Sequence, residues 1–390
     1  MIDRIKDEAG MTTNKKICIV ATVPVALRVF MLEHIRALSC YYDITLMANA
    51  DRSEMENLFS ENVRFVPLPI QRKVSLLSDV ISLWQVYRLF RKERFDCVFS
   101  IMPKSGLLSM VAAFVARVPH RIHMFTGQVW FTKSGLVRAG LKFLDKVLAW
   151  SATHVLADSP SQRQFLIDNK IVAAQKISVL GKGSISGVDI SRFKPDAPAR
   201  QKYRQELGII GDAVVFLFMA RLTHVKGILE LGRAFSDVAR EMPNAHLLVI
   251  GPDEDGVEGD LLGILEPFKS RVHRVGYTYN PEGYMAAADV FCIPSYREGF
   301  SLATIQAAGV GLPAIASHIY GLSDAVQRDM TGIFHEPGNL PEMIEALKKM
   351  YFDEQFRARL SRQAHERAHS EFSQDVIVSE MVAFIRKRVN

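Results

Sequence analysis

Short apolar runs alternate with helical patterns along almost the whole chain, and this alternation limits the folds that the chain can adopt. An apolar run of about four to eight residues, bounded by turn residues, is typical of a strand buried on both faces. One series of such runs extends from KICIVATV (16–23) to KISVLGKG (176–183), and a second extends from AVVFLFMARL (213–222) to TGIFHEP (331–337). Strands that alternate with helices form parallel sheets with helical crossovers, so the pattern predicts two doubly wound α/β domains.

The segment between the two series marks the domain boundary. GVDISRFKPDAPARQKYRQELGI (187–209) is polar and contains two prolines, as linkers often do, and we place the boundary near residue 195. Ligands of such sheets bind at the carboxyl ends of the strands, so a site is expected in a cleft between the domains. The expected organisation is a polar leader over 1–14, Rossmann-like domains over 15–195 and 196–374, and a terminal helix over 375–390 that packs back on the first domain.

Composition narrows the class of protein and its compartment. The chain has 390 residues, of which 48% are apolar, and this is enough to bury a large core. Its four cysteines have no short spacing, which excludes a classical zinc cluster and is typical of a reducing compartment. No apolar run reaches the roughly 18–20 residues that a bilayer-spanning helix needs, and the leader lacks the apolar core of a signal peptide. We therefore expect a cytoplasmic protein.

Charge is distributed unevenly along the chain. Residues 1–195 carry 27 Lys and Arg against 16 Asp and Glu, whereas the remainder carries 21 against 26. The excess of +11 in the first half indicates an anionic partner there, such as phosphate, nucleic acid or a membrane surface.

Two cations stand at the strand-to-helix turn in FMARLTHVKGILEL (218–231). A buried strand ends at Arg221, and Lys226 follows at the edge of a helix, beside Gly227. Cations beside a helix N-terminus form a diphosphate-binding arrangement, because side chains and backbone N–H groups then attract the same anion. The alternative is a pair of solvated loop charges, which are common at such turns.

A second turn of the same kind is found in SYREGFSLATIQAAGVGLPAIAS (295–317). A strand ends before Glu298, and a helix over 301–309 directs the backbone N–H groups of its first turn toward any phosphate bound there. Glu298 can accept hydrogen bonds from sugar hydroxyls, and the amide of Gln306 can bind neighbouring hydroxyls. The simpler interpretations are an N-terminal helix acid for Glu298 and a surface helix residue for Gln306.

The order of these motifs resembles a known family. ARLTHVKG, VIGPDEDG, YMAAADVFCIPSYREGFSLATIQAAGVGLPAIAS and GLSDAV…DMTGIFHEPGN follow one another as in family 4 of the retaining nucleotide-sugar glycosyltransferases, which have the B-type (GT-B) fold. GSISGVDISRFKP is similar to the family's NGVD…F.P at the crossover between domains. The resemblance covers nearly the whole chain from residue 15. It implies GT-B architecture: two doubly wound Rossmann-like domains that face each other across a cleft.

The resemblance implies roles for residues of the second domain. Arg221 and Lys226 would hold the donor diphosphate and Glu298 the donor sugar, which makes these three the expected catalytic residues. The chain departs from the family at Gln306, where a glutamate usually binds the ribose hydroxyls; an amide oxygen still accepts, but without charge assistance. The expected donor-binding residues are Gly251, Tyr277, Gly299, Phe300, Ser301, Leu302 and Gln306.

The first domain also departs from the family pattern. The family often has a histidine after the acceptor-facing strand, but alignment of RIHMFTGQVW on its glycine places Thr126 there, with His123 three residues earlier. His123 is then either an acceptor-site residue or a buried histidine with satisfied hydrogen bonds. SIMPKSGLLS offers a second phosphate site at a strand-to-helix turn. The expected acceptor or cleft residues are Arg28, Lys104, Ser105, His123, Thr126, Gly127 and Gln128.

The resemblance implies transfer of a hexosyl or N-acetylhexosaminyl group from a nucleoside diphosphate sugar, with UDP as the commonest nucleotide of the family, and with retention of configuration. The implied acceptor is a polyprenyl-diphosphate-linked saccharide of O-antigen or capsule synthesis, and nucleic acid is not an expected partner. No cofactor or metal is expected, and DED at 253–255 is interpreted as a solvated turn rather than an Asp-x-Asp metal motif. Two alternatives remain open: a nucleotide-sugar epimerase of the same fold, and a non-catalytic subunit that binds nucleotide sugars.

Two stretches of the basic half bear on the acceptor. VRAGLKFLDKVLAW (137–150) combines an apolar stripe with a basic one, and LLSDVISLWQVYRLFRKERF (76–95) has the same character. Such helices either pack on the core with solvated backs, or rest on anionic lipid at the inner face of the cell membrane. In the first of them the apolar stripe comprises Val137, Leu141, Leu144 and Leu148, and the basic stripe comprises Arg138, Lys142 and Lys146.

Overall fold

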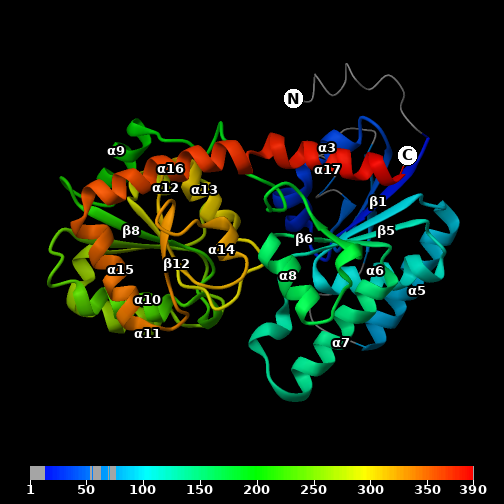
Figure 1. Ribbon diagram of the computed structural model, residues 1–390, viewed down its shortest axis with the longest axis horizontal. Helices are drawn as coiled ribbons and strands as arrows, with labels where there is room; N and C mark the ends of the chain where they lie inside the picture. The colour runs from blue at the N-terminus through cyan, green and yellow to red at the C-terminus, as the bar shows by residue number, and fades with distance from the viewer. Residues whose placement is uncertain (1–13, 53–54, 56–62, 69, 71–75, 390) are drawn as a thin grey trace. The chain divides into compact units, whose positions relative to one another are not determined.

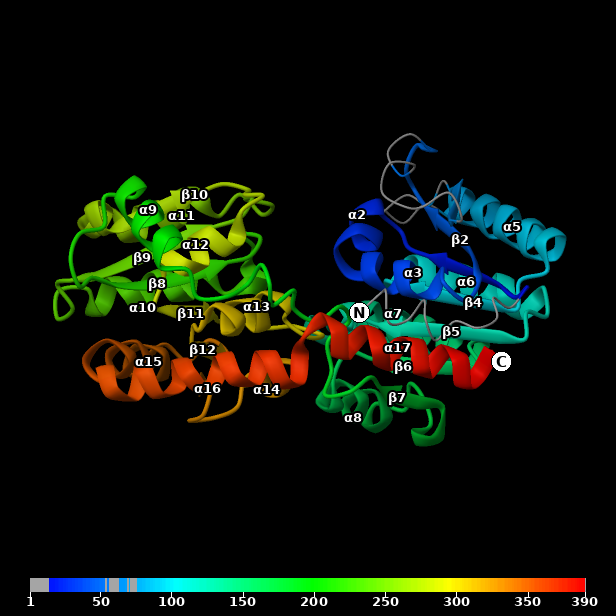
Figure 2. The same cartoon turned by 90° about the horizontal axis from the view of Figure 1, so that it is seen from above.

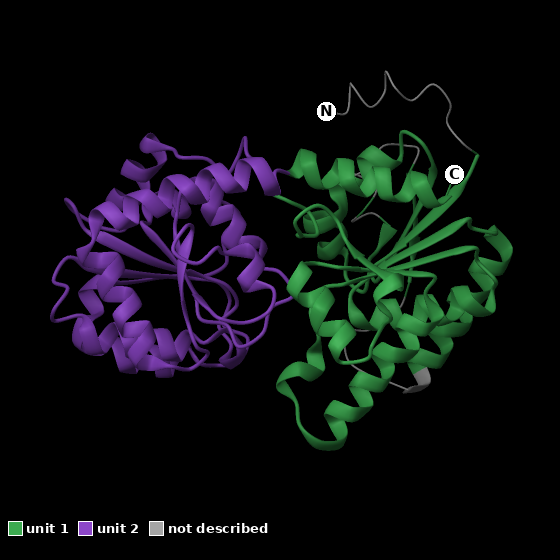
Figure 3. Ribbon diagram, in the orientation of Figure 1, with its two compact units in different colours: residues 1–187, 374–390 green, residues 188–373 purple. Residues whose placement is uncertain are grey.

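The computed structural model describes residues 14–52, 55, 63–68, 70 and 76–389 (Figure 1). The leader expected over 1–14 therefore lies outside the described residues, apart from its last residue. The chain divides into two compact units, unit 1 with residues 1–187 and 374–390 and unit 2 with residues 188–373 (Figure 3). The division lies at 187 rather than near 195, because Val188 and Phe193 are buried in the core of unit 2.

Unit 1 is built on a parallel sheet of seven strands. The strands are β1 (Lys16–Val20), β2 (Asp43–Ala48), β3 (Val63–Pro67), β4 (Cys97–Ile101), β5 (His120–Phe125), β6 (His154–Ala157) and β7 (Ile177–Val179). Their order is β3-β2-β1-β4-β5-β6-β7, and β4, β5 and β6 lie side by side in Figure 2. Ile17 and Ile19 of β1 face one core cluster, whereas Cys18 and Val20 face the other. Burial on both faces explains why each strand is a continuous apolar run in the sequence.

Helices cover both faces of this sheet. They are α2 (Pro24–Ala26), α3 (Leu32–Leu38), α5 (Leu76–Glu93), α6 (Pro103–Val115), α7 (Gly135–Ser151), α8 (Pro160–Asp168) and α17 (Gln374–Val389), with the short turns η1 (Leu27–Met31), η2 (Val129–Thr132) and η3 (Ala174–Lys176). One core includes side chains of α5, α6, α7 and α8, and the other includes side chains of α3 and α17. α17 packs on α3, and its Val378, Met381 and Ile385 are buried, so this last helix completes the core of unit 1.

The helix α7 is attached to unit 1 through Trp130 of η2. The indole Nε1 of Trp130 donates a hydrogen bond to Asp145 Oδ2 at 2.7 Å, and its ring stacks on Phe165 with 5.3 Å between centroids. Burial raises the pKa of Asp145 to about 6, although the hydrogen bond from Trp130 opposes this shift. Ionisation of the buried Asp145 carboxyl therefore destabilises the folded state as the pH rises.

We expect Asp145→Asn to raise the free energy of unfolding relative to wild type more at neutral pH than at acidic pH. The folded pKa of about 6 lies above the ordinary value of 3.8, so the proton on Asp145 favours the folded state fully below pH 3.8, and this contribution is lost as the pH rises through 6. Asparagine accepts the Trp130 hydrogen bond without ionising. Urea denaturation should show the variant gaining about 2 kcal/mol over wild type between pH 4.5 and pH 7.5. Asp168→Asn, an exposed carboxyl in the same unit, is the control, and a gain of the same size for both variants would contradict the prediction.

Unit 2 is built on a second parallel sheet, of six strands. The strands are β8 (Val214–Met219), β9 (Ala245–Ile250), β10 (Val272–Val275), β11 (Val290–Ile293), β12 (Ala314–Ser317) and β13 (Gly332–His335). Their order is β10-β9-β8-β11-β12-β13. The direction of winding reverses between β8 and β11, and in open α/β sheets this switch point is where ligands bind. The fold therefore directs attention to the loops that follow β8 and β11.

Helices also cover both faces of the second sheet. They are α9 (Ala197–Glu206), α10 (Ile228–Val238), α11 (Glu258–Leu265), α12 (Pro281–Ala287), α13 (Leu302–Val310), α14 (Leu322–Ala325), α15 (Leu340–Phe352) and α16 (Glu354–Phe372), with the turns η4 (His224–Lys226) and η5 (Glu266–Arg271). Side chains of α10, α11, α15 and α16 share one core, and those of α12 and α13 share the other. Among the helices of both units that the structure describes, none is long and apolar enough to cross a membrane.

Candidate active site

The loop after β8 is held between the loops that follow its two neighbours in the sheet. On one side the backbone N–H of Tyr296 donates to Val225 O at 2.9 Å. On the other side the N–H of Leu222 donates to Pro252 O at 2.8 Å. Because β9, β8 and β11 are adjacent and parallel, these three loops meet at the carboxyl edge of the sheet, at its switch point.

Two glycines allow the loops to approach so closely. Gly227 has φ +69°, and a Cβ built on it would lie 2.1 Å from Pro294 O. Gly251 has φ +136°, and a Cβ there would lie 1.9 Å from Ala220 O. An L-residue at either position would collide with backbone, so the geometry of the site depends on both glycines.

Lys226 and Glu298 meet across the switch point. Lys226 Nζ lies 2.5 Å from Glu298 Oε1, although the two residues are 72 positions apart in the sequence. Their side chains are only 17% and 12% exposed. An ammonium group has three N–H donors, so a lysine held by one carboxylate can still donate to an anionic ligand. The pair thus fixes a cation at the place where a doubly wound sheet binds its ligand.

Arg221 is held by the loop after β9. Its guanidinium pairs with Glu254, and both side chains are partly exposed. His224 Nδ1 lies 3.2 Å from Asp255 Oδ2, and the backbone N–H of His224, which donates to the same carboxylate, lowers the pKa of Asp255. Glu254, His224 and Asp255 are not among the site residues expected from the sequence. The available signal was the DED turn, which follows the strand next to β8.

The DED turn uses its carboxylates within the protein. Asp253 accepts the backbone N–H groups of Val257 and Glu258, at 3.0 and 3.1 Å, and so holds the N-terminus of α11. Glu254 and Asp255 are paired with the loop after β8. Over the ranges that the structure describes, no group of three or more His, Cys, Asp or Glu side chains is arranged to hold a metal ion. The interpretation of DED as a solvated turn therefore needs one change, because the turn also orients the loop after β8, which carries Arg221 and His224.

The helix α13 begins at Leu302, four residues after Glu298. Ser301 caps it, because its hydroxyl accepts hydrogen bonds from Thr304 N at 3.3 Å and Thr304 Oγ1 at 2.8 Å. The N–H groups of the first turn of a helix have no hydrogen-bond partner within the helix. An anion bound at the start of α13 can therefore accept hydrogen bonds from them. Gln306 lies half-buried on the second turn of α13.

The other expected donor residues differ in their surroundings. Gly299 is buried against Gly321, whose hypothetical Cβ would lie 2.3 Å from Gly299 O. Phe300 packs on Phe372 with 5.5 Å between ring centroids, so its side chain has a structural role. Tyr277 is exposed in the loop after β10, the edge strand, and contacts the ring of Tyr279. Gly251 lies at the site, as described above, whereas Tyr277 follows β10, which is separated from β8 by β9.

The structure buries several residues that the sequence analysis assigned to the acceptor site. His123 lies in the interior beneath α6, its Nδ1 is 2.8 Å from Ser100 Oγ, and burial lowers its pKa to about 3. Gly106 allows this approach, since a Cβ there would lie 2.3 Å from His123 Cε1. Gln128 is likewise fully buried. His123 is therefore buried, as the second interpretation expects, but its hydrogen bonds are only half satisfied, because Nε2 has no partner among the described residues.

The expected second phosphate site in SIMPKSGLLS is occupied by internal contacts. Lys104 Nζ lies 2.6 Å from Asp79 Oδ1, and the hydroxyl of buried Ser105 donates to Ile101 O at 2.6 Å. Both residues are in the first turn of α6, as expected, but their side chains face the protein. Arg28, in η1 after β1, is exposed, and Thr126 and Gly127 are partly exposed after β5. These three remain the accessible members of the acceptor set.

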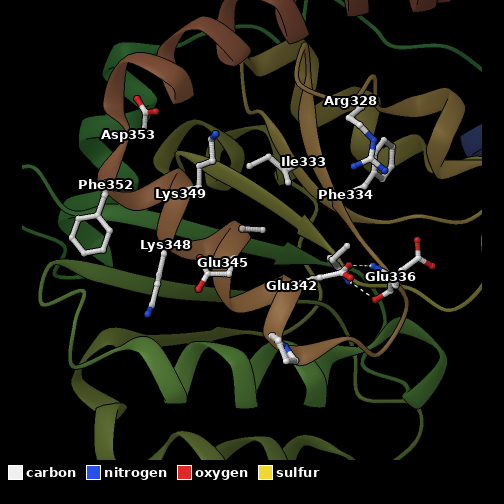
Figure 4. Close-up of a pocket in the computed structure, with 13 residues that line it drawn as sticks. Arg328, Ile333, Phe334, Glu336, Glu342, Glu345, Lys348, Lys349, Phe352 and Asp353 are labelled. Carbon is white, nitrogen blue, oxygen red and sulfur yellow. Dashed lines mark hydrogen bonds between the residues drawn. The ribbon is translucent and has the colours of Figure 1, made fainter.

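A hollow of about 950 Å³ lies elsewhere in unit 2, between β13 and α15 (Figure 4). Charged side chains of both signs line it, including Arg328, Glu345 and Lys349. The backbone N–H of Glu336 donates to Glu342 Oε2 at 2.7 Å within it. None of the residues expected at the donor site lines this hollow, so its volume does not bear on the reaction.

Comparisons with known proteins agree with this geometry. The family model for glycosyl transferases group 1 matches residues 199–367, and the model for the glycosyl transferase 4-like domain matches residues 31–183. The capsular polysaccharide biosynthesis glycosyltransferase CapM of Staphylococcus aureus is 29% identical over 339 residues, which cover 86% of this chain and 87% of CapM. The UDP-Gal:alpha-D-GlcNAc-diphosphoundecaprenol alpha-1,3-galactosyltransferase of Escherichia coli is 28% identical over 326 residues, covering 80% of this chain and 81% of that enzyme.

Structural comparison identifies the same fold. The crystal structure of Anabaena HepE in complex with UDP and glucose superposes with a TM-score of 0.78, covering 96% of this chain and 100% of HepE at 18% identity. Matches to two family models that together span most of both units, an ordered set of motifs and two sheets of this topology lead to one conclusion. The chain belongs to glycosyltransferase family 4 and is a glycosyltransferase of the GT-B fold.

Proposed function

We propose that this glycosyltransferase moves a sugar from a UDP-sugar to a hydroxyl of a lipid-linked saccharide in surface polysaccharide synthesis, with retention of anomeric configuration. The names of the relatives support this, since CapM acts in capsule synthesis and the E. coli enzyme uses UDP-Gal and a diphosphoundecaprenol-linked acceptor. The HepE complex supports UDP as the nucleotide. The observation that carries the proposal is the Lys226–Glu298 pair at the switch point, next to the N-terminus of α13.

In the proposed reaction the bond between the sugar C1 and the β-phosphate oxygen breaks, and the diphosphate gathers negative charge. Lys226, Arg221 and the first-turn N–H groups of α13 are placed to stabilise that charge before the reaction begins. The acceptor oxygen forms its new bond to C1 on the same face, and its proton passes to the departing phosphate oxygen. The carboxylates of Glu298 and Glu254 are each held by a cation, which favours phosphate assistance over a covalent intermediate on a side chain.

The nucleotide can be tested by thermal unfolding with UDP, GDP and dTDP in turn. We expect UDP to raise the melting temperature most, and Lys226→Ala to remove most of that increase, because binding to the folded state alone stabilises it. Stabilisation by GDP or dTDP but not UDP would contradict the choice of nucleotide. The proposal includes no metal, so EDTA should leave both the shift and the transfer rate unchanged.

The configuration of the product separates retention from inversion. Proton NMR of the new glycosidic linkage should show the same anomeric configuration as in the donor sugar. The epimerase alternative predicts a different result: conversion of the donor to a second nucleotide sugar in the absence of any acceptor.

A further inference from the structure

The helix α7 presents apolar side chains to solvent along its outer face. Leu136, Phe143 and Trp150 are 91%, 63% and 65% exposed. They are spaced seven residues apart, close to two helical turns, so they lie in one line. Figures 1 and 3 show the N-terminal end of α7 and the turn before it as the lowest part of unit 1.

This outer stripe is not the one that the sequence analysis identified. Of the predicted apolar stripe, Leu148 is buried and Leu141 is partly buried, whereas Val137 and Leu144 are exposed. The helix therefore has apolar side chains toward the core and also toward solvent. A core-facing helix needs only the first set, and the second set requires another explanation.

The charges around the outer stripe have one sign. Between residues 97 and 157 the sequence contains a single acidic residue, Asp145, together with seven Lys and Arg. The structure turns Asp145 inward to Trp130, so it does not offset the cations at the surface. Of the nearby cations, Lys133, Arg138 and Lys146 are exposed.

We infer that α7 and the turn before it dock this protein on an anionic lipid surface, with Leu136 and Phe143 inserted among the acyl chains and the flanking cations on the headgroups. A helix of 17 residues is about 25 Å long and can lie in the plane of the interface. Anionic headgroups complement the cations around the stripe, and each such cation strengthens the attraction. This inference rests on the proposed function and extends it, because a lipid-linked acceptor is presented at a membrane.

A second copy of the chain is the competing occupant of the stripe. Two copies joined through α7 would bring the same exposed cations face to face, with Asp145 of each copy turned away, and like charges repel. A lipid surface avoids this repulsion. The helix α5, which packs on α6 as α7 does, has exposed Val80, Ile81 and Trp84. These side chains cover little more than one helical turn, whereas the exposed apolar side chains of α7 extend over residues 136–150.

Vesicle flotation tests the inference. The full-length protein should float with phosphatidylcholine–phosphatidylglycerol vesicles and not with phosphatidylcholine alone. The double variant Leu136→Ser/Phe143→Ser should bind the mixed vesicles at least roughly tenfold less tightly, and Lys133→Gln/Lys146→Gln should weaken binding and reduce its salt dependence. Ile210→Ser is the matched control, since Ile210 is 87% exposed but belongs to unit 2, and it should bind like wild type.

The outcomes separate this inference from the proposed function. The two substituted side chains of α7 are exposed, so the double variant should fold and should keep the thermal shift with UDP. Wild-type protein that does not float, or a double variant that floats equally well, would overturn the inference, as would a dimer in light scattering that the double variant converts to monomer. Protein that floats as expected but transfers no sugar would refute the proposed function and leave the docking helix in place.

Discussion

Replacement of Lys226 by alanine is expected to slow sugar transfer by roughly 10²–10³-fold while the protein remains folded. The ammonium group lies beside the N-terminus of α13, where the diphosphate is proposed to leave, so its loss removes a preorganised positive charge. The change also leaves the nearly buried Glu298 carboxylate without its cation, and that carboxylate then repels the diphosphate. Steady-state kinetics should show the loss chiefly in kcat, and circular dichroism should show an unchanged fold.

The control for this prediction is Lys269→Ala. Lys269 also pairs with a glutamate in unit 2, but that pair is exposed and lies in η5, away from the switch point. We expect its rate to stay within about twofold of wild type, since exposed pairs contribute little. The rate of sugar transfer by Arg221→Ala should be reduced by about as much as that of Lys226→Ala. Turnover by Lys226→Ala within a few-fold of wild type would show that the lysine has no role in the mechanism.

Replacement of Gly227 by alanine is expected to have the largest effect on stability. A side chain there would require a left-handed conformation and would place its Cβ 2.1 Å from Pro294 O, so the backbone of one loop would have to move. We expect a decrease of about 3 kcal/mol or more in the free energy of unfolding. Because Gly227 directly follows Lys226, sugar transfer should fall together with stability.

Gly208→Ala separates the two causes of that loss. Gly208 has nearly the same φ, +67°, but a Cβ there would meet nothing within 4 Å. Its substitution should cost about 1 kcal/mol, which is the conformational penalty alone. Equal costs for the two substitutions, measured by urea denaturation, would show that the close approach to Pro294 is not a constraint.

The sequence predicted the strands well, because burial on both faces leaves a continuous apolar run. AVVFLFMARL contains β8, and DVFCIPS contains β11. The domain boundary was less accurate, because GVDISRF is polar in sequence and yet inserts Val188 and Phe193 into a core. The burial of a single apolar residue within a polar segment is visible only in the three-dimensional structure.

The candidate site was only partly predictable, because the sequence shows where strands end but does not show how the loops fold. Lys226 and Glu298 were assigned because each stands at a strand-to-helix turn, and the sheet order then brings the two turns together. The partners Glu254 and Asp255 could not be assigned in this way, because loop conformation decides which carboxylate reaches Arg221 and His224. The burial of His123 depends on the close packing of α6 at Gly106, which periodicity does not reveal.

The course of the chain has a consequence for biosynthesis. Unit 2 is an insertion within unit 1: it is entered at residue 188 and left at residue 373, and these two residues pair with each other as a β-bridge. A ribosome thus synthesises every residue of unit 2 before α17, and until then unit 1 lacks the buried face of that helix. Domains generally fold as units during synthesis. The half of the enzyme whose translation begins first is consequently the half that is completed last, and a chain that ends before residue 374 contains every residue of unit 2 but lacks the last helix of unit 1.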